Sequence, residues 1–257
     1  MEKEGERKSR LCRVVSSLDL CLLIRIIEEM NDRQRQLLGI VVEEYVKSAE
    51  PISSGFLAAA YSLGVSPATI RNDLAVLLDQ GYLKKNYFSS GNVPTNQAYR
   101  FFVNEMFDDS YEKKTRSEQH IPHFRSIDEI ARFMSDRSRL LSVVMNEDMD
   151  MAVDGINYLF AQPDFSSLEM MHDLACFVDA LMDMRQELFT VLADEDETIF
   201  IGEENPLFSR EHDLSWLVSS CDSFHNKRLA MFLVGPTRMP YERNATLLYG
   251  IRKYLSK

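Results

Sequence analysis

Four residues near the start of one short pattern are the best suited in the chain to contact another molecule. They are Ala68, Thr69, Arg71 and Asn72, and they lie on one side of the stretch Ser66 to Gly81. A small residue lets a helix backbone approach a surface closely, while Thr, Arg and Asn side chains offer donors and acceptors to base edges and phosphates. This combination predicts a helix that reads DNA.

The stretch around these residues has the signals of a capped helix. Ser66 suits the N-cap, Pro67 the first helical position, and Gly81 the residue just beyond the C-terminal end. Apolar residues at i, i+4, i+7 and i+8 form a stripe for burial, namely Ile70, Leu74, Leu77 and Leu78. The opposite side of a helix over residues 66–80 is therefore predicted to be free for a partner.

Each predicted contact residue also has a simpler structural role open to it. Ser66 and Thr69 either contact DNA or do no more than cap the helix. Arg71 is either a base or phosphate contact or a solvated surface charge. Asn72 either contacts DNA or makes a hydrogen bond inside its own domain. The sequence leaves these alternatives open.

The segments before this stretch predict a helix-turn-helix. Residues 31–47 form an amphipathic pattern that begins with a capping box of Asn31 and Gln34. Residues 53–63 predict a second, shorter helix, which ends at Gly64 and leads into the third through a three-residue turn. Two helices joined by a short turn that contains Gly are typical of helix-turn-helix proteins.

The segment after this stretch predicts a wing. Residues 82–95 read as a strand, a polar tip and a return strand, with Lys84 and Lys85 placed where phosphates could be met. A helix over 95–107 follows, and Arg100 lies off its apolar stripe, where it could reach a phosphate or form a salt bridge. Three helices followed by a hairpin make a winged helix-turn-helix domain.

Five motifs stand in a fixed order along the chain. They are EEYVKSAEPISS (43–54), SLGVSPATIRNDLAVLLDQGYL (62–83), SSGNVPTNQAYRFFV (89–103), GEENP (202–206) and GPTRMPY (235–241). Together they closely resemble the HrcA family of heat-inducible transcription repressors. The resemblance covers most of residues 31–107, thins out between 108 and 150, and returns from about 153 to the end.

The resemblance implies a particular biology. Such a family member is a dimeric cytoplasmic repressor that binds an inverted-repeat operator, called CIRCE, upstream of chaperone genes, and its activity is coupled to the chaperonin. The resemblance also implies a GAF-like second domain. That domain is expected to be truncated here, because residues 141–144 pass almost directly to 154–159 where family members have a longer stretch.

The chain departs from the family at several positions in the winged helix. Family members carry a basic residue, a His, a Thr and an Arg where this chain has Gly55, Tyr87, Phe88 and Asn92. Each departure is expected to remove a possible phosphate or groove contact. The segment from Ala68 to Asn72 is retained, so the same mode of docking is expected.

The distribution of charge separates two regions of the chain. The composition, with 45% hydrophobic and 27% charged residues, is that of a soluble globular protein, and the net charge is −11. Residues 31–107 hold seven basic and seven acidic residues, whereas 108–257 hold sixteen basic and twenty-seven acidic ones, which accounts for the whole excess. An acidic C-terminal body would repel a duplex everywhere except at the winged helix, and so orient it.

The expected fold class is α+β, in four regions. Residues 1–30 are an N-terminal extension of uncertain role, 31–107 a winged-helix DNA-binding domain, 108–125 a linker, and 126–257 a truncated GAF-like domain with a long helical dimerisation element. In the last region, helices are predicted over 127–141 and 241–255, and strands over 198–201, 214–219 and 228–234.

The long helical element begins at residue 166, with a predicted capping box of Ser166 and Glu169 and a break at Arg185. Its first apolar stripe follows steps of three and four, through Leu168, Met171, Ala175, Val178 and Met182, and Leu174, Leu181 and Leu188 widen that stripe. The element is either an ordinary core helix or a dimerisation helix.

Several classes of function are not expected. Cys12, Cys21, Cys176 and Cys221 lie far apart without a C-x-x-C spacing, so neither a disulfide nor a metal site is predicted. The nucleotide-binding, hydrolase and metalloprotease motifs are missing, so neither an enzyme nor a cofactor is expected. The apolar run near the N-terminus is interrupted by charge, which argues against a targeting or membrane segment.

The sequence therefore predicts a DNA-binding transcriptional repressor of chaperone genes. Two copies would bind double-stranded DNA at an inverted repeat through helix 66–80 and wing 82–95, with chaperonin as a further partner. The alternative is a protein-interaction or ligand-sensing adaptor whose winged helix no longer reads DNA.

Overall fold

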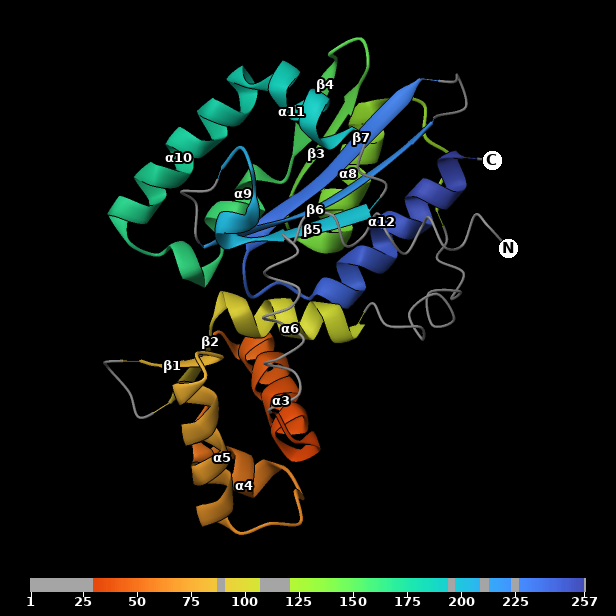
Figure 1. The fold of residues 1–257 in the computed structure, drawn as a ribbon. Helices are drawn as coiled ribbons and strands as arrows, with labels where there is room; N and C mark the ends of the chain where they lie inside the picture. The colour runs from red at the N-terminus through yellow and green to blue at the C-terminus, as the bar shows by residue number, and fades with distance from the viewer. Residues whose placement is uncertain are drawn as a thin grey trace. The chain divides into compact units, whose positions relative to one another are not determined.

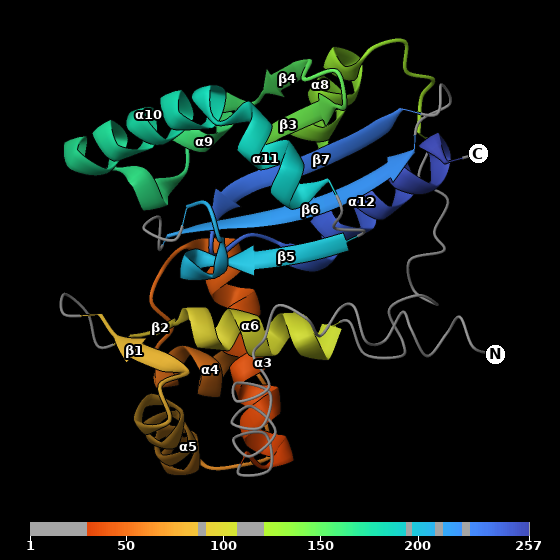
Figure 2. The ribbon, with the colours of Figure 1, turned by 45° about the horizontal axis from the view of Figure 1, so that its top comes forward.

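The computed structural model describes residues 30–86, 91–106, 121–193, 197–208, 213–222 and 227–256. The chain is a mixed helix and sheet protein that divides into two compact units after Ala98 (Figures 1 and 2). The expectations for the N-terminal extension, for the hairpin tip with Tyr87 and Phe88, and for most of the linker lie outside the described residues.

The first unit consists of helices followed by a short antiparallel hairpin. Its elements are α3 (Asp32–Ser48), α4 (Ser54–Ala60), α5 (Pro67–Asp79), β1 (Leu83–Lys85) and β2 (Asn92–Pro94), and α6 (Asn96–Met106) contains the boundary between the units. The predicted capping box of α3 is confirmed, since the Gln34 backbone N–H donates to Asn31 Oδ1 at 3.0 Å and the Asn31 backbone N–H donates to Gln34 Oε1 at 3.1 Å. This satisfies two N–H groups that an uncapped helix would leave unpaired.

The turn before α5 is longer than the predicted three residues. Helix α4 ends at Ala60, and the chain runs from Tyr61 to Ser66 before α5 begins. Leu57 is the only buried residue of α4, so few packing contacts stabilise a longer helix. Tyr61 lies just beyond the helix, and its side chain hydrogen-bonds Glu44 of α3. The left-handed conformation of Gly64 (φ +67°) then helps the chain to reverse.

The second unit is built on a five-stranded antiparallel sheet of order β4-β3-β7-β6-β5. Its strands are β3 (Leu141–Asn146), β4 (Met151–Asp154), β5 (Glu197–Ile201), β6 (Leu214–Asp222) and β7 (Arg228–Pro236). Its helical segments are α8 (Ile127–Ser138), α9 (Ile156–Phe160), η1 (Pro163–Phe165), α10 (Leu168–Asp183), α11 (Arg185–Leu192), η2 (Gly202–Glu204) and α12 (Tyr241–Leu255). The predicted strands and the last helix are confirmed.

Helices cover both faces of this sheet (Figure 2). On one face, alternate residues of β3, β6 and β7 pack against α10 and α11 around Trp216, which lies against Phe177, Phe208 and Phe232. On the other face, α8 and α12 lie against the sheet, where Ser142 Oγ donates to the carbonyl of Ala131 at 2.6 Å. The two-residue period of a strand accounts for this division of side chains between the faces.

Two predictions about the second unit are wrong in their details. The helix expected over 127–141 ends at Ser138, because Arg139 adopts a left-handed conformation (φ +60°) and Leu141 begins a buried strand. The long helical element is capped by Ser167 rather than Ser166, because the buried Phe165 holds the preceding residues in a 3-10 turn. Ser167 Oγ accepts from the Met170 N–H at 3.1 Å.

The long helical element is two helices, α10 and α11, which meet at Met184. The predicted apolar stripes of α10 lie on different faces. Leu174 and Leu181 are buried in the core with Phe177, whereas Leu168 is 86% exposed. Met171, Ala175 and Met182 are exposed on the same side as Leu168, and Val178 is half-buried. A core role and a free apolar face therefore coexist in one helix.

Candidate nucleic-acid interface

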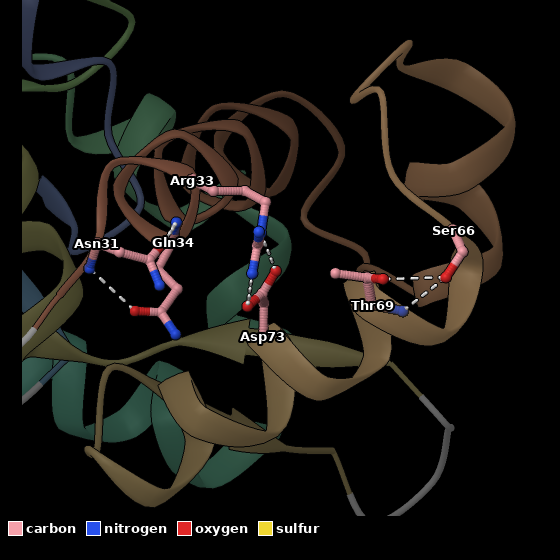
Figure 3. Close-up of polar contacts among 6 residues, drawn as sticks. All are labelled: Asn31, Arg33, Gln34, Ser66, Thr69 and Asp73. Atoms are coloured by element: carbon pink, nitrogen blue, oxygen red, sulfur yellow. Dashed lines mark hydrogen bonds and ion pairs between the residues drawn. The ribbon is translucent and has the colours of Figure 1, made fainter.

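Helix α5 is held to the start of α3 by an ion pair that the sequence did not reveal. The Arg33 guanidinium donates twice to the Asp73 carboxylate, from Nε to Oδ2 at 2.6 Å and from Nη2 to Oδ1 at 2.9 Å (Figure 3). Asp73 is only 5% exposed, and its hydrogen bond and charge raise the pKa of Arg33. A two-pronged contact of this kind fixes orientation as well as distance, so it helps to set which face of α5 points outward.

The predicted cap at the start of α5 is confirmed. Ser66 Oγ accepts from the Thr69 backbone N–H at 3.1 Å and lies 2.9 Å from Thr69 Oγ1 (Figure 3). Pro67 is the first helical residue, and Gly81 follows the helix with φ +79°. The Ser66 hydroxyl therefore caps the helix and contacts the Thr69 hydroxyl. This is the capping role that the sequence offered as the alternative to DNA contact.

The exposed face of α5 carries the other predicted contact residues. Ala68, Arg71 and Asn72 are all exposed, and Ile70, Leu74 and Leu77 are buried as the stripe predicts. Arg71 Nε donates to the carbonyl of Pro67 at 3.3 Å, which directs the side chain back along the first turn. Three further exposed residues, Ala75, Val76 and Asp79, belong to this face and could have been found by continuing the helical period.

The hairpin places its two lysines in different settings. Lys84 and Lys85 are both exposed, and Lys85 Nζ donates to Asn92 Oδ1 at 2.9 Å. Asn92 is only 1% exposed, and its side-chain amide donates to the carbonyl of Ile52 at 3.0 Å. The Asn92 side chain therefore faces inward and links β2 to the residues before α4. The expectation that a DNA contact is lost at this position stays a prediction.

Arg100 belongs to the second unit. Its Nε donates to Glu204 Oε1 at 2.9 Å, its Nη2 also pairs with Glu204 Oε2, and Nη2 donates to the carbonyl of Ile199 at 2.7 Å. This is the salt-bridge alternative for Arg100. These contacts occupy its guanidinium, because both Nε and Nη2 are already paired within the second unit.

The described part of the chain offers no competing metal site or membrane segment. Among its residues, no group of three or more His, Cys, Asp or Glu side chains could hold a metal ion. Cys176 is an exposed free thiol and Cys221 a buried one. None of the helices described is long and apolar enough to cross a membrane.

Helix α4 leads through a turn into the capped helix α5, which exposes one face, and a separate unit built on a five-stranded sheet follows. This arrangement defines a helix-turn-helix protein with a C-terminal sheet domain. Residues 42–88 match the DeoR-like helix-turn-helix domain. Residues 74–244, more than half of the 257-residue chain, match the HrcA protein C terminal domain. The chain belongs to the HrcA family.

Named relatives agree with this membership. The chain is 55% identical over 76 residues to the heat-inducible transcription repressor HrcA of Bifidobacterium animalis subsp. lactis, a region that covers 30% of this chain and 21% of that protein. It is 38% identical over 136 residues to the protein of the same name from Chlorobium chlorochromatii, which covers 49% and 39% respectively. The similarity thus spans between a fifth and two fifths of the length of these relatives.

One solved structure shares the fold. A crystal structure described as a hypothetical protein superposes with a TM-score of 0.71 and covers 89% of this chain and 98% of its own. The sequence identity is 18%, so the likeness concerns the fold alone.

Proposed function

We propose that this protein is a sequence-specific DNA-binding transcriptional repressor of heat-shock genes, acting in the cytoplasm on a CIRCE-type inverted repeat. The observation that carries the proposal is the exposed face of α5, where Ala68, Arg71 and Asn72 point away from a buried stripe anchored by Arg33 and Asp73. In this proposal α5 enters the major groove of DNA and the hairpin β1–β2 acts as a wing. The names of the relatives support the same reading.

The wing and the cap have supporting roles in this proposal. Lys84 and Lys85 are exposed and would meet phosphates, which supply affinity without sequence information. Ser66 and Thr69 would bring the N-terminal end of α5 to the DNA backbone while keeping the helix capped. Arg100 is left out of the proposed interface because its guanidinium is bound to Glu204.

An inverted repeat requires two copies of the reading helix, and α10 offers a surface for a second copy. Its exposed apolar residues recur in steps of three, four and seven, the spacing of a helix-pairing seam, and they are Leu168, Met171, Ala175 and Met182. A twofold dimer through this face of a GAF-like unit would match the symmetry of the operator. We propose α10 as the dimerisation element.

Coupling to the chaperonin, implied by the family resemblance, is part of the proposal. Operator binding would be compared with and without chaperonin after a heat pulse. Stronger recovery of binding with chaperonin would support the coupling, and equal recovery would remove it.

The main test is fluorescence anisotropy with a labelled CIRCE-type repeat and a scrambled duplex, each at two salt concentrations. The expected result is tighter binding to the repeat than to the scrambled duplex, with affinity falling as salt rises and with Arg71→Ala binding more weakly than the wild type. Equal and weak binding to both duplexes, together with failure to select any preferred sequence from random duplexes, would overturn the proposal.

That second outcome would favour an adaptor that binds protein or a small ligand instead of DNA. One observation favours this second candidate. Residues 31–107 carry equal numbers of acidic and basic residues, which leaves little positive field to draw DNA to a winged helix.

A further inference from the structure

The row of exposed residues that faces directly away from the buried side of α5 does not include Arg71. Exposed residues recur at i, i+4, i+7 and i+11 along one side of the helix, and they are Ala68, Asn72, Ala75 and Asp79. This line lies opposite the buried residues Ile70, Asp73, Leu74 and Leu77. Arg71 is displaced from Asn72 by about 100° around the axis, because an α-helix has about 3.6 residues per turn. Asn72 therefore lies at the middle of the exposed face and Arg71 at its side.

The surroundings of Asn72 leave its amide free. In the part of the chain that the structure describes, the Asn72 side chain makes no hydrogen bond, so the alternative of an in-domain contact is not realised. One turn to either side stand Ala68 and Ala75, whose methyl groups allow the helix to come close to another surface. Arg71, by contrast, is turned toward the carbonyl of Pro67.

We propose that Asn72 is the specificity-determining residue of α5 and reads an adenine in the major groove. An asparagine amide matches adenine with two hydrogen bonds, donating from Nδ2 to N7 and accepting at Oδ1 from the N6 amino group. The inference rests on the proposed DNA-binding function and names the base that the site would recognise. Arg71, at the side of the face, contacts the phosphate backbone and contributes affinity that does not depend on sequence.

The far end of the outward line is consistent with this arrangement. Asp79 is exposed and carries a negative charge, which phosphates repel. The N-terminal half of α5, with Asn72 and its two alanine neighbours, is therefore the part that enters the groove. Asn72 is then the only amide side chain on the inserted half of the helix.

The test replaces one acceptor atom of the base, N7, by a C–H group. A preferred duplex is selected from random sequences with the full chain, and each adenine of one half-site is replaced in turn by 7-deazaadenine, which lacks the N7 acceptor. At one adenine we expect the wild-type protein to lose about fivefold in affinity, as for one neutral hydrogen bond. Asn72→Ala should be insensitive to that replacement and should lose roughly 5- to 150-fold of its preference for that base pair.

The matched control is Arg71→Ala, which alters the neighbouring residue on the same helix. It should weaken binding to the normal and the 7-deaza duplex by the same factor and lower the salt slope, whereas Asn72→Ala should leave that slope unchanged. Circular dichroism melting of both variants confirms that they fold, since both side chains are exposed.

Two results would overturn the inference, and they are distinguishable. If Asn72→Ala remains as sensitive to 7-deazaadenine as the wild type, or if Arg71→Ala abolishes the base preference, another residue reads the base and only this inference fails. If the wild-type protein prefers no sequence at all, the proposed function fails with it.

Discussion

Helices α5 and α10 are both amphipathic, but their exposed faces differ in polarity. Each buries one apolar face, α5 through Leu74 and Leu77 and α10 through Leu174 and Leu181. The exposed face of α5 is small, polar and close to neutral, whereas that of α10 is apolar and flanked by carboxylates, namely Glu169, Asp173, Asp179 and Asp183. An acidic face repels a polyanion and an apolar one favours a protein partner. Amphipathic periodicity thus shows that a helix has two faces, but the residues of the outer face decide what it can bind.

The largest expected effect separates the two faces of α10. Leu181→Ala removes a side chain with 0% exposure from the core of the second unit and should lower the free energy of unfolding by roughly 2–5 kcal/mol. Leu168→Ala, at 86% exposure on the same helix, should change the free energy of unfolding of the monomer by less than about 0.5 kcal/mol. Urea unfolding followed by the fluorescence of Trp216, the single tryptophan, measures both. Equal losses would contradict the assignment of the faces.

A second variant tests what the outer face of α10 binds. Leu168→Glu combined with Met182→Glu places charge on the proposed seam and should weaken self-association at least about tenfold, since each apolar side chain buried in an interface contributes about 1.5–3 kcal/mol. Sedimentation velocity over a concentration series gives the result. Ile156→Glu, on an exposed position of α9, is the control. Unchanged association in the double variant would remove α10 from the dimer interface.

A third pair of variants tests the start of α5. Ser66→Ala removes the cap and should destabilise the first unit by about 1 kcal/mol, whereas Ser66→Asp keeps a capping oxygen and should preserve stability. The added charge of Ser66→Asp should nevertheless weaken DNA binding. Hydrogen exchange of the α5 amides reports stability and anisotropy reports binding. If Ser66→Asp bound DNA as well as the wild type does, the end of α5 would not lie near the backbone.

The smallest expected effect concerns the hairpin. Lys84→Ala and Lys85→Ala should each reduce the slope of log affinity against log salt by about 0.9 if each lysine neutralises one phosphate. Lys47→Ala is the control, because Lys47 lies on α3 and pairs with Glu44 at 2.8 Å. Unchanged slopes in both hairpin variants would show that neither lysine meets a phosphate and would contradict the proposed role of β1–β2.

Local signals predicted α5 well because they act within one turn of the helix. Ser66, Pro67 and Gly81 are next to the elements they start or stop, and the buried stripe follows from the helical period alone. The hairpin β3–β4 was missed, because residues 141–154 form two short strands whose partners are decided by the sheet. Helix α4 was predicted too long because its end depends on a distant contact, the hydrogen bond between Tyr61 and Glu44 of α3.

Contacts between distant residues could not be read from the pattern. Arg33 and Asp73 are forty positions apart, and Arg100 and Glu204 are one hundred and four apart. Each side chain taken alone resembles an ordinary surface charge. Asn92 likewise resembled an exposed hairpin residue until its bond to Ile52 placed it inside.

The sequence by itself determined the family, the capped helix that carries Arg71 and Asn72, and the main strands of the second unit, because caps, periodicity and motifs are local properties of the chain. Only the tertiary structure decided which stripe of α10 is buried and that Arg100 is bound to Glu204. The physical reason is that burial and pairing depend on which surfaces meet after folding, and one apolar or charged residue can serve either face until its neighbours are in place.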